Sequence, residues 1–168
     1  LLTQGLADHT HPATLSLLPK DVPVVGSPAA AKVAAGLGFS DVIGLRPGDT
    51  HSHRQLDIQA TAAARVPMVE NGYLLDWANG SLYLEPHGVL DPALAKRPVD
   101  TVITPVIDLG LPLAGNFITG ASVLPKLIEQ FEPQQVLAST TGGDVRFSGL
   151  ISRFLSTVGG EATHKPHD

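Results

Sequence analysis

Short apolar runs alternate with segments of helical periodicity along the first part of the chain. The run at residues 23–26 is typical of a short buried strand, and residues 41–45 form a second such run. Between them, Ser27-Pro28 predicts a helix start, because serine caps helices and proline suits their first turn. This helix is expected to end near Leu37, and a shorter helix is predicted at residues 11–18. Strand–helix–strand alternation favours an α/β layer over a β-sandwich.

The middle of the chain has the period of a strand. Residues 55–60 alternate strictly between apolar and polar side chains, so one face of this strand is expected to be buried and the other wet. Two further apolar runs, at 72–77 and 81–85, flank Asn79-Gly80. That residue pair favours the type I′ turn of a two-residue hairpin. The sequence therefore predicts antiparallel strands in this region.

The last part of the chain again mixes strands and helices. Residues 101–106 and 135–139 are compact apolar runs of the kind found in buried strands. Short helices are predicted from Asp91 and from Ser122, the second with an apolar stripe at helical spacing. A closing helix is predicted over residues 147–158.

Composition restricts the class of protein. The chain has 168 residues, of which 43% are hydrophobic. We expect one globular domain at residues 1–160 and a mobile tail without an apolar anchor at residues 161–168. The chain has no cysteine, which excludes disulfides, thiolate metal sites and cysteine nucleophiles. No run is long enough for a membrane-spanning helix and the first residues lack the features of a signal peptide, so we expect a cytoplasmic protein without a membrane partner.

Charge and motif content exclude several functions. The 11 basic and 16 acidic residues give a net charge of −5, and 5% of residues are aromatic, so we expect no nucleic-acid partner. The chain has no G-x-S-x-G elbow, no Walker-type loop and no G-x-G-x-x-G after a strand. Seven histidines are the remaining compositional sign of chemistry.

The densest group of candidate ligands is Asp8-His9-Thr10-His11, which follows the apolar residues that open the chain. Loops at the carboxyl ends of strands carry the sites of α/β sheets, and carboxylate and imidazole groups there can converge on one divalent ion. In the alternative interpretation, Asp8 or Thr10 caps the next helix and the histidines are solvated. These residues alone leave both interpretations open.

The stretch from Thr3 to His9 resembles a degenerate copy of the T-H-x-H-x-D-H signature of the metallo-β-lactamase-fold hydrolases. Further strings resemble the cyanobacterial and plastid-type branch of that superfamily: Glu70-Asn71-Gly72-Tyr73, Ser81-Leu82-Tyr83-Leu84-Glu85-Pro86-His87 and Val102-Ile103-Thr104-Pro105-Val106. The resemblance covers most of the chain up to about Val158. It implies an α/β fold of the metallo-β-lactamase type, a four-layer αββα sandwich.

The resemblance also implies roles for single residues. In the superfamily, two histidines of the signature and a later one hold a first metal, and its aspartate and last histidine hold a second. Asp8 and His9 match the second-metal positions. Gln4 and Leu6 stand at the two first-metal positions, so we expect the first site to be lost. His87 falls near the position of the superfamily's bridging carboxylate and is expected to replace it.

We therefore expect at most one rearranged mononuclear site, formed by Asp8, His9 and His87 with His11 or Glu85. Three imidazoles and a carboxylate suit Zn²⁺ with an open position for water. Asp8 would be a ligand or the base that orients this water toward a carbonyl or phosphate. The resemblance thus implies a hydrolase of an unidentified small molecule. The alternatives are a binding or structural pseudoenzyme in which zinc is partial or absent, and a non-haem iron oxidoreductase, which would need more ligands than we find.

A separate histidine pair, His51 and His53, follows the turn-like residues 47–50. On a strand, alternate side chains share a face, and both rings could then bind one metal ion. Because a turn precedes the pair, we expect a solvated loop at this place instead.

Compared with the fold that it resembles, the chain starts at the metal-binding loop. We therefore expect the amino-terminal strands of that fold to be lacking here, or to be supplied by a partner chain. A homodimer is one such arrangement, because an unpaired sheet edge favours pairing.

Overall fold

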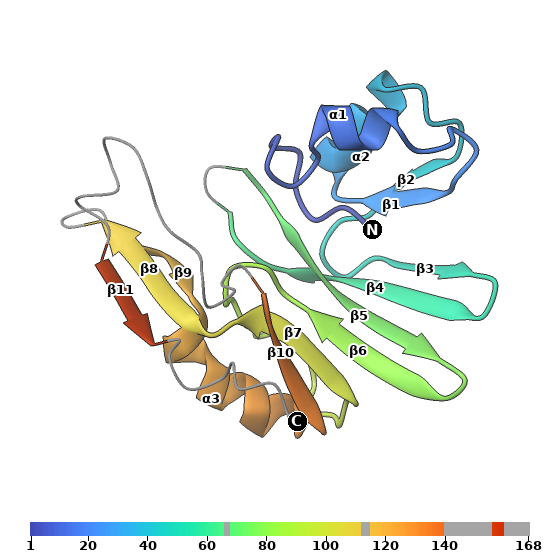
Figure 1. The fold of residues 1–168 in the computed structure, drawn as a ribbon. Coiled ribbons are helices and arrows are strands. Elements are labelled where there is room, and N and C mark those ends of the chain that lie inside the picture. The colour runs from blue at the N-terminus through green and yellow to red at the C-terminus, as the bar shows by residue number, and fades with distance from the viewer. Residues whose placement is uncertain (66–67, 112–114, 140–155, 160–168) are drawn as a thin grey trace, which may run out of the picture. The chain divides into compact units, whose positions relative to one another are not determined.

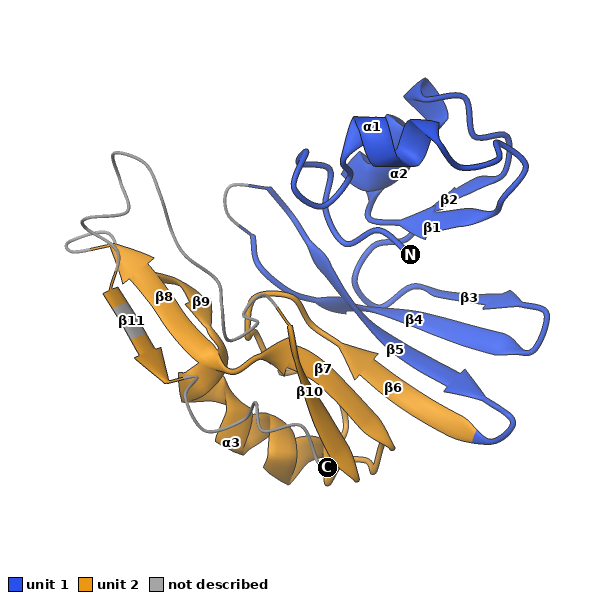
Figure 2. Ribbon diagram, viewed as in Figure 1, with its two compact units in different colours: residues 1–79 blue, residues 80–168 orange. Residues whose placement is uncertain are grey.

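A computed structural model describes residues 1–65, 68–111, 115–139 and 156–159 of the chain (Figure 1). Within the span where the sequence predicts one domain, these residues form two compact units, 1–79 and 80–168 (Figure 2). The chain passes from one unit to the other at the turn between β5 (Asn71–Trp77) and β6 (Gly80–Leu84). Both strands are present where the sequence predicts them, but the predicted turn is wrong: it lies at Ala78-Asn79, because Gly80 already begins β6. Neither Asn79 nor Gly80 has the positive φ that a type I′ turn requires.

The first part of unit 1 is a small α/β layer, as the sequence predicts. The short helix α1 (Pro12–Ser16) precedes β1 (Val24–Gly26), α2 (Pro28–Gly36) and β2 (Val42–Gly44). The strands β1 and β2 pair in parallel, and α2 connects them. Ser27 caps α2, because its hydroxyl oxygen accepts a hydrogen bond from the backbone N–H of Ala30.

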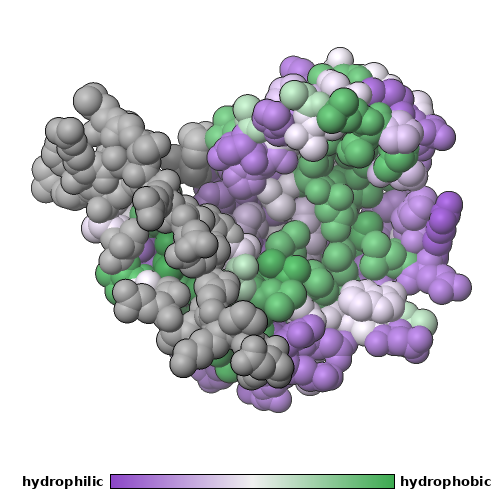
Figure 3. All heavy atoms as spheres, in the orientation of Figure 1, coloured by the Kyte–Doolittle hydropathy of each residue, from purple (hydrophilic) through white to green (hydrophobic). Residues whose placement is uncertain are grey.

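Apolar side chains from this layer make its core. The cluster consists of four buried residues: Leu15, Val24, Ala34 and Phe39. The partly buried side chains of Leu2, Leu37 and Val42 pack against it. Leu17 and Leu18, just after α1, remain exposed, and Figure 3 shows hydrophobic side chains among hydrophilic ones over this part of unit 1. The layer therefore buries the inner side of its helices, as expected of amphipathic elements.

The second part of unit 1 is an antiparallel sheet. Its strands β3 (Thr50–His53), β4 (Leu56–Ala62) and β5 lie in the order β3-β4-β5. The prediction of a loop at residues 51–53 is wrong: these residues belong to β3. A two-residue turn joins β3 to β4, and this turn allows the short polar segment to pair along the alternating strand that follows.

Unit 2 contains two groups of strands. In the first, β7 (Thr101–Pro105) pairs in parallel with β6 on one side and with β10 (Gln135–Ser139) on the other. In the second, β8 (Ile107–Leu111) pairs antiparallel with β9 (Gly115–Thr119) and with β11 (Ser156–Gly159). The helix α3 (Gly120–Phe131) connects β9 to β10.

The apolar side of α3 packs closely within unit 2. The rings of Tyr83 and Phe131 stack with their centroids 4.4 Å apart, and both side chains are fully buried. Gly120 lies against the backbone of β7, since a Cβ added there would come within 2.2 Å of the carbonyl oxygen of Pro105. Only glycine allows the first turn of α3 to approach β7 so closely.

Two predicted helix starts are wrong. The helix expected from Asp91 is a turn, in which the Asp91 carboxylate accepts a hydrogen bond from the N–H of Ala93. The helix α3 begins before Ser122, with Thr119 at its N-cap. Ser122 does not cap it, because its N–H and its hydroxyl both donate to the buried carboxylate of Asp108.

The predicted closing helix is wrong at its end. Residues 156–159, which include Val158, form strand β11 and pair with β8, and this pairing overrides the local helical periodicity. The rest of that predicted helix and the predicted tail lie outside the described residues. Within the described part of the chain, no helix has the length and hydrophobicity needed to cross a membrane.

Candidate metal centre

Backbone hydrogen bonds to β1 and to β5 hold the start of the loop that carries the predicted signature within unit 1. The N–H of Leu2 donates to the carbonyl of Val25 in β1, and the N–H of Asn71 in β5 donates to the carbonyl of Thr3. Gly5 allows the close approach of α2, since a Cβ there would meet the Cβ of Ala29 at 2.9 Å. These contacts bring the residue before β5, Glu70, to the loop.

His9 and Glu70 form the centre of this arrangement. Nδ1 of His9 lies 3.2 Å from Oε1 of Glu70 and 2.9 Å from the hydroxyl oxygen of Thr3. The Glu70 side chain is fully buried, and that of His9 is 16% exposed. A carboxylate is costly to bury unless a cation or hydrogen-bond donor compensates it, so this pair of side chains is suited to hold positive charge.

Asp8 and His11 differ in their surroundings. Oδ2 of Asp8 lies 3.6 Å from Nε2 of His9, and the Asp8 side chain is 75% exposed. His11 is exposed and caps α1: its Nδ1 accepts from the N–H of Thr14 and lies 2.8 Å from the hydroxyl oxygen of that residue. The cap predicted at Asp8 or Thr10 is therefore supplied by His11, and Nε2 is the atom that its predicted role as a metal ligand would use.

Gln4 stands at a position where the signature has a histidine. Its side chain is 1% exposed, and its amide N–H donates to the carbonyl of Met68 over 3.3 Å. Its amide oxygen is buried and has no hydrogen-bond partner among the residues that the structure describes. A cation or a water molecule would satisfy this acceptor.

In unit 2, His87 belongs to a turn that a buried carboxylate organises. Glu85 is fully buried and accepts hydrogen bonds from the backbone N–H groups of His87, at 3.1 Å to each carboxylate oxygen, and of Gly88. The carbonyl of His87 accepts from the N–H of Thr119. Glu85 thus fixes the backbone from which the imidazole of His87 projects.

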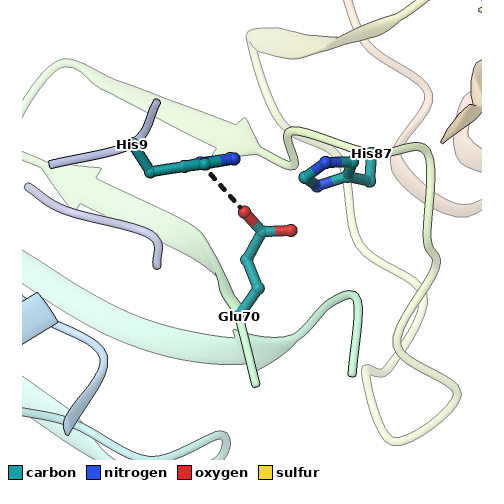
Figure 4. Close-up of side chains that lie close together, drawn as sticks. All are labelled: His9, Glu70 and His87. Carbon is teal, nitrogen blue, oxygen red and sulfur yellow. Dashed lines mark ion pairs between the residues drawn. The ribbon is translucent and has the colours of Figure 1, made fainter. Parts of the chain in front are cut away.

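Within unit 1, His9 offers an imidazole nitrogen and Glu70 a carboxylate oxygen, which are donors suited to one metal ion. Figure 4 draws these side chains, and its dashed line marks the ion pair of His9 with Glu70 inside unit 1. Two ligands of one tetrahedral zinc ion, each about 2.0–2.2 Å from it, lie roughly 3.4 Å apart. The 3.2 Å between Nδ1 of His9 and Oε1 of Glu70 is close to this value, so these two residues fit a shared ion.

Sequence reasoning did not identify Glu70 as a ligand. Glu70 appeared only within a string that resembles the superfamily. The available signal is its context: it is a carboxylate placed directly before the apolar strand β5, a place where a charged group becomes buried. Its proximity to His9 depends on contacts between segments far apart in the sequence.

These sheets and the few helices that accompany them define the class of protein: the chain has the metallo-β-lactamase fold, as the signature predicts. No family model matches the sequence, and no curated protein matches it. Among solved structures, the chain is similar to a variant of the β-hydroxylase CmlA, with a TM-score of 0.64 and 18% identity over 80% of this chain and 34% of that one.

Two further solved structures are similar to the chain at a comparable level. A possible metal-dependent hydrolase from Veillonella parvula has a TM-score of 0.61 and 16% identity, over 82% of this chain and 59% of that one. An isothiocyanate hydrolase from Delia radicum gut bacteria has a TM-score of 0.59 and 15% identity, over 80% and 58%. The chain thus spans between about a third and three fifths of the length of these structures. The likeness establishes the fold, and the cyanobacterial and plastid-type branch stays a prediction.

Proposed function

We propose that the chain is a metal-dependent hydrolase-type protein with one metal site that acts on a small molecule. His9 and Glu70 of unit 1 form this site, and His87 is the further ligand that the sequence resemblance implies. The observation that carries this proposal is the buried Glu70 carboxylate, which lies 3.2 Å from an imidazole nitrogen on the loop that resembles the superfamily's metal-binding signature. The fold shared with hydrolases of known structure supports the reaction class.

The chemistry of the donors favours zinc. Two imidazoles and one carboxylate are a known set of protein ligands for catalytic zinc, with the fourth position left for water. When bound, such an ion supplies a water of lowered pKa and polarises a carbonyl or phosphoryl oxygen. The absence of cysteine leaves nitrogen and oxygen as the donor types, and these also accept iron and manganese.

The other residues around His9 hold it in place. The hydroxyl of Thr3, at 2.9 Å from Nδ1, and the carboxylate of Asp8, at 3.6 Å from Nε2, lie at its two ring nitrogens. Asp8 is the candidate general base, because its exposed carboxylate can take a proton from a nearby water and release it to solvent. His11 remains a predicted ligand and would act through Nε2.

Metal content and two substitutions test the proposal. Elemental analysis of the purified full chain is expected to find zinc, iron or manganese near one equivalent. Glu70→Gln removes the charge but keeps the shape, and His87→Asn removes the imidazole. Each should weaken metal binding by at least 10- to 100-fold, the loss seen even for residues that only orient ligands. Circular dichroism of the metal-free variants checks that both are folded.

His11→Asn separates the two roles of His11, because asparagine also caps helices but does not replace the imidazole as a ligand. If this variant keeps its metal while Glu70→Gln loses it, the site consists of the buried residues and His11 only caps α1. Two results together would show that the proposal is wrong. The purified protein would hold less than about a tenth of an equivalent of metal, and it would bind added zinc no more tightly than Glu70→Gln does.

A second candidate function, a binding or structural protein without catalysis, is favoured by Gln4. Its amide donates to Met68 at a position where the signature has a metal-binding histidine, so a two-metal reaction centre has no support. Metal content near zero in the folded wild-type chain, with unchanged stability after Glu70→Gln, would favour this candidate.

A further inference from the structure

A second pair of imidazoles lies on β3, which is far in the sequence from the loop that carries His9. His51 and His53 are alternate residues of this strand, so their side chains project from the same face. Both histidines are half-buried, whereas Thr50, which precedes them, and Ser52, which lies between them, are exposed. This alternation is that of an ordered strand and not of the solvated loop that the sequence predicts.

Local contacts hold the two histidines in register. His51 pairs with Ile58 and His53 with Leu56 on the neighbouring strand β4. The two-residue turn between the strands contains Arg54 at a φ of 56°, the left-handed backbone typical of tight hairpins. On the opposite face, the hydroxyl of Ser52 donates to Asp57 over 2.5 Å.

The surroundings of the pair suit a ligand site. Among the described residues, neither imidazole forms a hydrogen bond or an ion pair. Their cross-strand neighbours, Leu56 and Ile58, are apolar and bring no competing cation. In the described sheet β3 is the last strand, so its outer side has no neighbouring strand there. Ordered imidazoles without protein partners are available to an external electrophile.

The spacing matches a chelate. Alternate residues of an antiparallel strand are about 6.8 Å apart, and two imidazoles projecting from one face can both turn a nitrogen toward an ion placed between them. Coordination at about 2.0–2.1 Å then brings the two nitrogens to about 3 to 4 Å from each other. We propose that His51 and His53 together bind one divalent transition-metal ion, with water in the remaining positions.

The preferred ions follow from the donors. Two neutral imidazoles and water are borderline ligands, for which affinity rises through the series to Cu²⁺ and is lower again for Zn²⁺. The site should therefore bind Cu²⁺ or Ni²⁺ more tightly than Zn²⁺. The net charge of −5 favours cations in general, whereas Arg54 in the adjoining turn opposes them.

The test uses the full chain and Ni²⁺ in isothermal titration calorimetry. His164→Ala and His167→Ala are introduced into every sample so that these two histidines do not contribute. His51→Asn and His53→Asn should each weaken the β3 site at least tenfold, a loss comparable with that from removing even an outer-shell group. Both variants keep the residues of the candidate metal centre, whose own binding should not change.

The decisive variant exchanges two neighbours, Ser52→His with His53→Ser. It keeps the composition of the strand, but adjacent residues point to opposite faces, so the two imidazoles can no longer share an ion. We expect the exchange to remove this site as completely as His51→Asn does. Equal Ni²⁺ affinity in the exchanged and parent proteins would overturn the proposal.

A second readout locates the ion independently of affinity. Substoichiometric Cu²⁺ should broaden the amide resonances of residues 50–58 in the parent protein, and this broadening should disappear in the exchanged variant. Broadening confined to other residues would also overturn the proposal. Because the compared proteins differ only in β3 and all keep His9 and Glu70, failure here leaves the proposed function untouched, and the reverse holds as well.

Discussion

Replacement of Glu85 tests whether a buried carboxylate organises the turn that carries His87. The Glu85 side chain is fully buried, and its two oxygens accept from the N–H groups of His87 and Gly88. Gly88 has a φ of +79° and lies against the start of α3. The backbone around His87 therefore depends on this one side chain for two of its hydrogen bonds.

The magnitude follows from those two donors. A hydrogen bond to a charged group contributes about 1.5 to 3 kcal/mol, and removal of the buried charge recovers part of its desolvation cost. Glu85→Ala should therefore lower the free energy of unfolding by about 3 kcal/mol, near the lower end of the sum of two such bonds. Glu85→Gln keeps one oxygen acceptor but turns an amide N–H₂ toward a donor, so we expect about half of that loss.

Urea unfolding followed by circular dichroism measures both variants, and the metal affinity of the full chain reports on His87. We expect the order wild type, Glu85→Gln, Glu85→Ala in both stability and affinity. The single tryptophan, Trp77, lies in unit 1, and its fluorescence gives a second probe of the same unfolding. The reasoning is refuted if Glu85→Ala is within about 1 kcal/mol of wild type, or if Glu85→Gln is the more damaging change.

Three further substitutions and one control, Gly36→Ala, test the packing and the ionisation of buried groups. Burial, with a smaller contribution from the charge of Glu70, raises the pKa of Tyr73 to about 12 against the ordinary 10, although the hydrogen bond from Asn71 opposes this. Between pH 10 and pH 12 the tyrosine ionises in the unfolded chain but not in the folded one, so Tyr73 lowers the free energy of unfolding by at most about 3 kcal/mol over this range and has no such effect below pH 10. Alkaline melting curves of Tyr73→Phe should lack this part of the decline. Phe131→Ala should cost about 3 to 5 kcal/mol in urea unfolding, because it removes a fully buried ring, and a loss below about 1 kcal/mol would contradict the described core. Gly120→Ala should destabilise the chain because its Cβ would meet the backbone of Pro105, whereas Gly36→Ala, where nothing lies within 4 Å, should be neutral or stabilising by up to about 1 kcal/mol; equal effects of the two would contradict the close approach of α3.

Local patterns predicted most of the secondary structure. Ser27 and the alanine-rich stretch after it specify α2 through capping and helix propensity, which act within a few residues. The strict alternation in β4 predicted a strand correctly for the same reason. The Asn79-Gly80 signal placed a turn between two strands, but the turn lies one residue earlier and Gly80 belongs to β6. The helix expected at Asp91 and the cap expected at Ser122 failed because each side chain forms a different hydrogen bond, Ser122 with the distant Asp108.

For the candidate site, too, local strings could be interpreted from the sequence and contacts between distant segments could not. His9 could be selected from the sequence, because a signature is a local string that resembles a known one. Glu70 could not, because its burial and its 3.2 Å distance from His9 depend on the hydrogen bond between Asn71 and Thr3. The exposure of the Asp8 side chain, which lies beside the His9 ring but is not buried with it, likewise depends on the path of the loop.

By itself, then, the sequence of this chain determined an acidic, cysteine-free α/β protein of the metallo-β-lactamase fold with a degenerate histidine signature. Tertiary structure decided which carboxylate faces His9, which histidine caps α1, and that His51 and His53 share a strand face. The physical reason is that helix caps, turns and alternation act between near neighbours. The contacts that decide a site join segments far apart in the sequence, and they form only when the hydrophobic layers pack.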